Sequence, residues 1–281
     1  MKGKLIIGLL LLLYSVFLPP FTQFMKQRPV EVKLGYVPHP RVLKLMSADQ
    51  NLLTAASMIT KVLFYYGTLV QKYNENIIIY PEQENMFKTL LTAVQLDPYN
   101  MDAYYFAQAS FTWGVGRVKE VNKLLERGAL FRKWDPSLPF YIGFNNAYFL
   151  KKYTLAAEYM KKAAEISGNP MYTNLAARYF YESAQTAFGL AFLEAMIKSA
   201  HDDTVRQSYK IRYDSLLAVH QIETAIVHYR KKHGSDPKRI EDMIEDGFLE
   251  KSPADPYGGT FYLDEQGKVR TTSKLAPMKR E

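Results

Sequence analysis

The feature that most constrains the fold is a pattern of paired helices that recurs along the middle of the chain. From Ser47 onward, apolar residues recur at steps of three or four, the spacing that places side chains on one face of a helix. The first such stripe is Leu52, Ala55, Ile59, Val62 and Tyr66. Prolines, which a helix interior does not tolerate, follow at positions 98, 136 and 170. A single helix pair cannot bury its apolar face, so the repetition predicts pairs that stack around a continuous core.

The segment 47–202 resembles the tetratricopeptide (TPR) repeat family, whose unit of about 34 residues places small and aromatic residues where its two helices cross. The residues that carry the resemblance are Met86, Leu90 and Ala93; Tyr104, Ala107, Gln108, Phe111, Val121, Leu125 and Gly128; Tyr141, Phe144, Asn145, Tyr148, Ala156, Met160 and Ala163; and Tyr172, Leu175, Ala176, Tyr179, Gly189, Leu193 and Met196. The loop WGVGR at 113–117 departs from the family by one extra residue. The resemblance implies a mainly α fold, a right-handed α-solenoid of about four TPR-like helix pairs.

TPR proteins bind partners in a concave groove lined by the first helix of each pair, and the resemblance carries nine groove positions over to this chain. They are Tyr105, Ala109 and Trp113, then Ile142, Asn146 and Phe149, then Thr173, Ala177 and Phe180. The set is aromatic and uncharged, whereas clamping a C-terminal carboxylate needs basic residues. The resemblance therefore implies a groove for an extended or helical apolar peptide. The alternative is that these aromatics pack against Ile77 to Ile79 or against the C-terminal segment.

The N-terminus has the pattern of an export signal. Lys2 and Lys4 precede the apolar run LIIGLLLLLYSVFL at 5–18, after which Pro19 and Pro20 predict the end of any helix. The length of the run favours a cleaved signal peptide, because a spanning helix usually needs about 20 apolar residues.

The residues after the apolar run favour an uncleaved anchor instead, because 15–27 contains no site of the small-residue type that signal peptidase needs. We therefore predict a signal anchor or signal peptide over 1–24, which contacts the membrane through residues 5–18. The expected location is the bacterial inner membrane, in a single pass, with the bulk of the chain in the periplasm. Three prolines within 25–46 predict an extended linker.

The last part of the chain, 203–281, has a different character. An apolar stripe predicts a long helix that ends near Gly234, followed by a short helix with Ile240 and Met243 and a β-hairpin about 265–268. This segment resembles the globular end of type II secretion pseudopilins, although the pilin N-terminus is absent. The matching residues are Tyr229, Arg230, Gly234, Pro237, Pro253, Asp255, Pro256, Tyr257, Gly258, Phe261, Tyr262 and Ser273.

The pseudopilin resemblance implies a small α+β segment, and it also raises the question of calcium, which major pseudopilins bind in this region. Asp255, Asp264 and Glu265 could supply oxygen ligands. The alternative is that these acidic residues only form turns, which is their commoner role and the one we predict.

Composition and motifs argue against several functional classes. The absence of cysteine among 281 residues excludes disulfides, thiolate metal sites and cysteine nucleophiles. The net charge of +8 is spread thinly rather than gathered into a stripe, so no nucleic-acid partner is predicted. No G-x-S-x-G, P-loop or dinucleotide-binding glycine pattern occurs, so we predict no catalytic residues, no cofactor and no metal site.

The sequence therefore predicts a non-catalytic, membrane-anchored periplasmic TPR scaffold or assembly factor, which binds a protein or peptide in its groove. The pseudopilin resemblance suggests that the partner belongs to an envelope, secretion or pilus-type complex. Two alternatives stay open: a structural subunit of such a complex without a client of its own, and a periplasmic chaperone-like factor. Helical repeats share a fold across unrelated tasks, so the choice among them depends on the partner.

Overall fold

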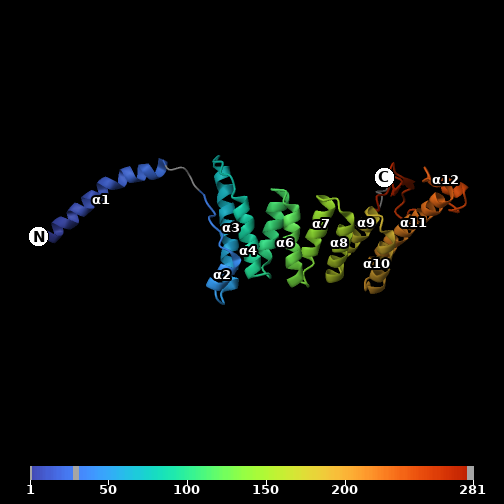
Figure 1. Ribbon diagram of the computed structural model, residues 1–281, viewed down its shortest axis with the longest axis horizontal. Helices are drawn as coiled ribbons and strands as arrows, with labels where there is room; N and C mark the ends of the chain where they lie inside the picture. The colour runs from blue at the N-terminus through green and yellow to red at the C-terminus, as the bar shows by residue number, and fades with distance from the viewer. Residues whose placement is uncertain (1, 28–31, 277–281) are drawn as a thin grey trace.

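The computed structural model describes residues 2–27 and 32–276, which are mainly α-helical (Figure 1). Helix α1 spans Lys2–Gln27. The central helices are α2 Pro40–Met46, α3 Asn51–Asn74, α4 Gln83–Leu96, α5 Met101–Phe106 with its π-helical continuation η1 Ala107–Thr112, α6 Val118–Phe131, α7 Ser137–Tyr148, α8 Tyr153–Ser167, α9 Pro170–Glu182 and α10 Thr186–Ser199. The C-terminal elements are α11 Asp203–His233, α12 Ile240–Glu245, β1 Phe261–Leu263 and β2 Val269–Thr271.

From α3 to α10 the central helices lie side by side in the order of the chain, and each packs against the next, whereas the short α2 packs on α4 (Figure 1). Small residues allow this close approach: Ala156, Ala157, Ala163 and Ala164 on α8 are all fully buried. A Cβ added at Gly143 on α7 would lie 3.2 Å from the Met160 side chain of α8. The mainly helical fold predicted from the periodicity is confirmed, whereas the right-handed TPR superhelix stays a prediction.

Helix α1 continues where the sequence predicted a stop. It runs through Pro19 and Pro20 to Gln27. The prolines remove the two main-chain donors that would bond the carbonyls of Ser15 and Val16, and the helix nevertheless continues for seven residues beyond Pro20. In the turn that follows, the Thr22 hydroxyl donates to the carbonyl of Leu18 at 2.8 Å.

The linker predicted over 25–46 contains a helix in its second half, α2, and residues 28–31 of that linker lie outside the described residues. Pro40 occupies the first turn, where its missing N–H is not needed. The ring of His39 caps the helix by accepting from the N–H of Arg41 at 3.3 Å. Pro40, one of the three prolines that predicted an extended chain, therefore begins a helix instead.

The C-terminal elements agree with the sequence prediction. Asp202 caps α11 by accepting from the N–H of Val205 at 2.8 Å, and Gly234 ends the helix in the left-handed conformation at φ 71°. Strands β1 and β2 pair antiparallel, with Phe261 opposite Thr271. The sheet docks on the central helices, because the hydroxyl of Tyr181 on α9 donates to the carbonyl of Val269 at 3.0 Å.

Two buried tyrosines make the fold sensitive to alkaline pH. Burial raises the pKa of Tyr104 and of Tyr181 from the ordinary 10 to about 12. Above pH 10 the unfolded chain loses these protons while the folded chain keeps them, so the free energy of unfolding decreases. The stability present below pH 10 should therefore fall as the pH rises towards 12.

This dependence can be measured by following helical circular dichroism and tyrosinate absorbance together through an alkaline titration. We expect the variants Tyr104→Phe and Tyr181→Phe to lose stability less steeply over this range than the wild-type chain. Wild-type protein that titrates all its tyrosines near pH 10 while still folded would contradict the prediction.

Candidate protein-interaction surface

A cluster of aromatic side chains lies where η1 meets α7. The helix that starts at α5 widens into the π-helix η1, a rare form that is frequently found at functional sites and holds more residues per turn than an α-helix. It ends at Thr112, and Trp113 is the first residue of the loop that has the extra residue. Gly114 follows because an added Cβ there would lie 2.8 Å from the carbonyl oxygen of Ser110. This local geometry places the Trp113 ring at the surface, 56% exposed.

The Trp113 ring contacts three rings that come from α7 and its C-terminal end. The ring centroids lie 4.9 Å from Phe149, 5.4 Å from Tyr148 and 6.0 Å from Phe144. Phe144 and Tyr148 are one helical turn apart and stack at 5.4 Å with an interplanar angle of 9°. Spacings of 4.5–7 Å with tilted or offset rings are favourable, so these residues hold one another in place.

The cluster continues along α7 to α9. The Phe140 ring lies 6.3 Å from that of Phe144 and 5.1 Å from that of Tyr172 at the start of α9. We call the set Trp113, Phe140, Phe144, Tyr148, Phe149 and Tyr172 the aromatic face. Trp113 and Tyr148 are the most exposed of its residues, at 56% and 53%. The aromatic face thus joins three successive first helices of the predicted pairs.

A row of tyrosines borders the aromatic face. Tyr105 on α5 is 59% exposed. Burial raises the pKa of Tyr141 on α7, and the neighbouring Tyr105, Asp135 and Tyr172 raise it further. Lys151 supplies the cationic edge, with its Nζ atom 5.5 Å from the Tyr148 ring centroid. The surface therefore presents ring faces and neutral phenols with one ammonium group at its side.

The nine groove positions carried over from the family divide into two groups. Tyr105, Ala109 and Trp113 are exposed, and Phe149 is half-buried within the aromatic face. The other five side chains face the interior: Ile142, Asn146, Thr173, Ala177 and Phe180, each at most 4% exposed. Beside four of the carried-over positions on α7, at its C-cap and on α9, the preceding tyrosine is the more accessible side chain: Tyr148 is exposed, and Tyr141, Tyr172 and Tyr179 are half-buried. Asn145 and Ala176, which precede Asn146 and Ala177, are fully buried. One residue turns a helix by about 100°, which is enough to move a side chain from the surface to the core.

A buried polar network lies directly behind the aromatic face. Asn145 on α7 and Gln108 on η1 exchange two amide hydrogen bonds of 2.8 and 2.9 Å. The Asn145 amide also donates to Asn122 on α6 at 2.8 Å. Because buried amides need partners, these bonds fix η1 and α6 against α7 and so position the rings in front of them.

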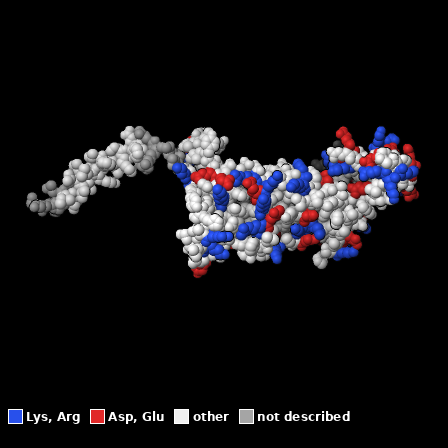
Figure 2. Space-filling view, viewed as in Figure 1, with Lys and Arg blue, Asp and Glu red and all other residues white. Residues whose placement is uncertain are grey.

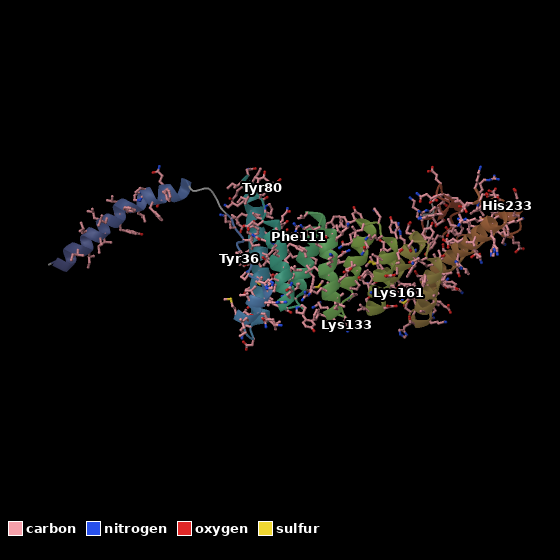
Figure 3. The ribbon with its side chains drawn as sticks, viewed as in Figure 1. Tyr36, Tyr80, Phe111, Lys133, Lys161 and His233 are labelled. Atoms are coloured by element: carbon pink, nitrogen blue, oxygen red, sulfur yellow. The ribbon has the colours of Figure 1, made fainter. Side chains whose placement is uncertain are left out.

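The opposite helices of the stack form a hollow of about 700 Å³ around α6 and α8. Leu130 lies at its edge, 70% exposed. The charged residues of its lining are mixed: Lys123, Glu126, Arg127, Arg132, Lys133, Asp135, Lys162 and Glu165. Figure 2 shows the same interspersion of both signs along the stack, and the labelled Lys133 and Lys161 of Figure 3 lie along its lower edge. Five of the charged lining residues are basic and three are acidic, and Arg132 pairs with Asp135 at 2.8 Å, so the hollow has a small basic excess.

Two of the three acidic residues considered as calcium ligands, Asp255 and Asp264, accept bonds from protein donors, whereas Glu265 is exposed. Asp255 accepts from the N–H of Tyr257 at 3.0 Å and from the hydroxyl of Ser273 at 2.6 Å, and also from Thr271. Asp264 accepts from Arg270 at 2.9 Å. Among the described residues no group of three or more His, Cys, Asp or Glu gathers in a way that could hold a metal ion. The carboxylates here close turns and join the sheet to the preceding loop.

The N-terminal helix is long and apolar enough to cross a membrane. Its candidate span is Ile6–Phe24, 19 residues of mean hydropathy 1.8, and none of that window is buried against the rest of the chain. Helix α3 passes the same test of length and composition, but it packs on α4 and contributes five residues to the core. Of these two helices, α1 is therefore the candidate for a membrane span.

Comparisons of the chain with protein-family models, with curated proteins and with solved structures give no match. The TPR and pseudopilin resemblances accordingly stay predictions from the sequence.

Proposed function

We propose that this chain is a non-catalytic, membrane-anchored scaffold or assembly factor that binds an apolar protein segment on its aromatic face. The observation that carries the proposal is the exposure of Trp113 and Tyr148 at the outer edge of a cluster whose other rings are half-buried. Tryptophan and tyrosine with a rigid, desolvated base are the residues that dominate binding at protein interfaces. Helix α1 supplies the membrane attachment.

The chemistry of the aromatic face selects the kind of partner. The rings offer apolar area, and the phenol groups of Tyr105, Tyr141 and Tyr148 offer hydrogen bonds at its border. Such a surface suits an extended or helical segment with apolar side chains and some polar backbone or side-chain groups. Lys151 favours a partner with a carboxylate near Tyr148. The polar network behind the rings keeps the surface preorganised, which lowers the entropy cost of binding.

The setting of the proposal is the periplasmic side of a bacterial inner membrane, in an envelope, secretion or pilus-type complex. The export signal supports the location, and the pseudopilin-like residues between 220 and 275 support the type of complex. A structural subunit without a client of its own is the alternative. It differs in that the aromatic face would be permanently covered by one stoichiometric neighbour.

A photo-crosslinking amino acid at Tyr148 in the full-length protein tests the proposal in cells. We expect capture of a defined envelope protein from the membrane fraction, and no capture from the same amino acid at Phe188 on α10, which is 67% exposed. Trp113→Ala should reduce the yield at Tyr148 about tenfold, equivalent to about 1.4 kcal/mol of binding free energy.

The outcomes separate the candidate functions. A captured partner that exchanges in a pulse-chase experiment supports a scaffold with a client, whereas one stable stoichiometric partner supports a structural subunit. Many unrelated captured proteins would indicate a chaperone-like factor. Equal yields at Tyr148 and Phe188, unaffected by Trp113→Ala, would overturn the aromatic face as a binding surface.

A further inference from the structure

The C-terminal end of α3 forms a second exposed apolar surface, separate from the aromatic face. Helix α3 has 24 residues against 14 in α4, and its upper end projects above the neighbouring helices (Figure 1). Tyr73, Ile78 and Tyr80 at this end are 71%, 75% and 88% exposed. Figure 3 places Tyr80 at the top of α3, and Figure 2 shows the projection drawn almost wholly without charged atoms. We call these three residues the α3 tip.

Chain connectivity ties the α3 tip to the end of α1. The N–H of Leu34 donates to the carboxylate of Glu82 at 2.9 Å, and Leu34 is only 2% exposed. The N–H of Glu82 in turn donates to the hydroxyl of Tyr65 on α3 at 2.9 Å. Leu34 is therefore fixed beside Glu82, and Glu82 follows Tyr80 of the α3 tip by two residues.

This attachment limits how far the α3 tip can lie from a membrane that α1 spans. Gln27, the last residue of α1, precedes Leu34 by seven residues, and a fully extended chain of that length reaches at most about 25 Å. The limit holds for every orientation of α1 relative to the stack. The end of α3 is thus held near the membrane surface on the side to which α1 leads the chain.

The composition of the tip suits the interface between lipid headgroups and acyl chains. Tyrosine is enriched there because its ring is apolar and its hydroxyl can stay hydrated. Residues 76–81, NIIIYP, carry no charge. Just before them, Glu75 forms an ion pair with Lys72 at 2.6 Å, so the two charges nearest the turn are of opposite sign and in contact. The main chain of the turn is also bonded, with the N–H of Ile77 donating to the carbonyl of Lys72 at 2.8 Å.

We propose that the α3 tip enters the interfacial layer of the membrane that α1 spans, as a second and shallower membrane contact of the same chain. The proposal rests on the membrane anchoring in the proposed function, and it adds the orientation of the helices. One anchor alone sets no orientation of the stack relative to the membrane, whereas two contacts hold α3 end-on to it. The aromatic face would then lie at a fixed height above the lipid.

The absence of cysteine from the chain allows a direct test with single labels. Full-length protein with Ile78→Cys carries an environment-sensitive fluorophore and is reconstituted in phosphatidylcholine vesicles that contain a lipid with a shallow spin-label quencher. We expect a blue shift and quenching of the emission. The matched control is Leu130→Cys on α6, which is 70% exposed and should be neither shifted nor quenched.

Further measurements distinguish contact of the α3 tip with lipid from contact with a second copy of the chain. A label at Leu11→Cys, measured with a lipid that carries the spin label deep in its acyl chain, reports the anchor itself, because Leu11 lies inside the candidate span Ile6–Phe24. Quenching at Leu11 without quenching at Ile78 would overturn the α3 tip and leave the anchor intact, whereas no quenching at either position would overturn both. A blue shift at Ile78 without quenching, lost when the protein is diluted among vesicles, would overturn the lipid contact in favour of a second copy of the chain. A last comparison places the label at Asn76→Cys. We expect quenching in this single variant and no quenching when Tyr73→Ser and Tyr80→Ser are added to it.

Discussion

Asn145→Leu is expected to lower the free energy of unfolding by roughly 2–6 kcal/mol, because it leaves two buried amides without their partner. Gln108 would lose both of its bonds to Asn145, and Asn122 would lose the donor to its side-chain oxygen. Asn145 itself is fully buried and Gln108 and Asn122 are each 6% exposed, so water cannot replace these bonds without opening the packing of η1, α6 and α7. Chemical denaturation followed by circular dichroism measures the change.

The matched control uses the same chemical change in all members of the network. Replacing Gln108, Asn122 and Asn145 together by leucine removes the orphaned amides, so the triple variant should lose much less stability than the sum of the three single variants. Losses that simply add would show that the three amides do not act as a unit. If the triple variant keeps its stability, the crosslinking yield from Tyr148 can be measured in it. A lower yield than in the wild-type chain would show that the network positions the aromatic face.

Asn145 and Asn146 show where sequence reasoning about this chain stops. The TPR-like pattern includes Asn145 among residues typical of the repeat and carries Asn146 over to the groove. Both are buried: Asn145 joins the network, and Asn146 donates to the carbonyl of Ile142 at 2.9 Å within its own helix. Periodicity identifies a helix and its approximate apolar side, but an aromatic-rich helix such as α7 has rings on most sides. Its rotation is then decided by buried amides that only the packed structure brings together.

A usable signal for the surface of α7 was nonetheless present in the sequence. Phe140, Phe144 and Tyr148 recur at steps of four and define one stripe. The stripe lies beside the carried-over positions Ile142 and Asn146 and forms half of the aromatic face. Trp113 could be placed at the end of its helix from the family pattern, whereas its contacts with Tyr148 and Phe149 depend on how η1 meets α7.

The ends of the chain were predictable to different degrees. The long helix that ends at Gly234 and the hairpin about 265–268 follow from local signals, namely an apolar stripe, a helix-ending glycine and a short turn, and all of these act over a few positions. Asp255 reads as a turn former in sequence, yet it accepts bonds from Thr271 and Ser273 more than a dozen positions later. Such distant pairings leave no local pattern.

Gly128→Val is expected to destabilise the fold by about 3 kcal/mol, the upper end of the cost of overpacking a core. A Cβ at Gly128 on α6 would lie 2.7 Å from the Cζ atom of Tyr104 on α5 and 3.1 Å from Leu138 at the start of α7. The Tyr104 ring is fully buried and its hydroxyl donates to the carbonyl of Pro98 at 2.9 Å, so it cannot swing aside cheaply. Thermal and chemical denaturation measure the loss.

The matched control is Gly67→Val, in an exposed part of α3 where an added Cβ meets nothing within 4 Å. That variant should change the stability by no more than about 0.5 kcal/mol. Because Gly128 is costly only through its neighbour, Tyr104→Ala should relieve part of the strain, and the double variant should be more stable than the two single effects predict. Independent, additive effects would mean that α5 and α6 do not meet through this pair. Glycine at position 128 would then not be explained by the crossing of α5 and α6, on which the repeat interpretation depends.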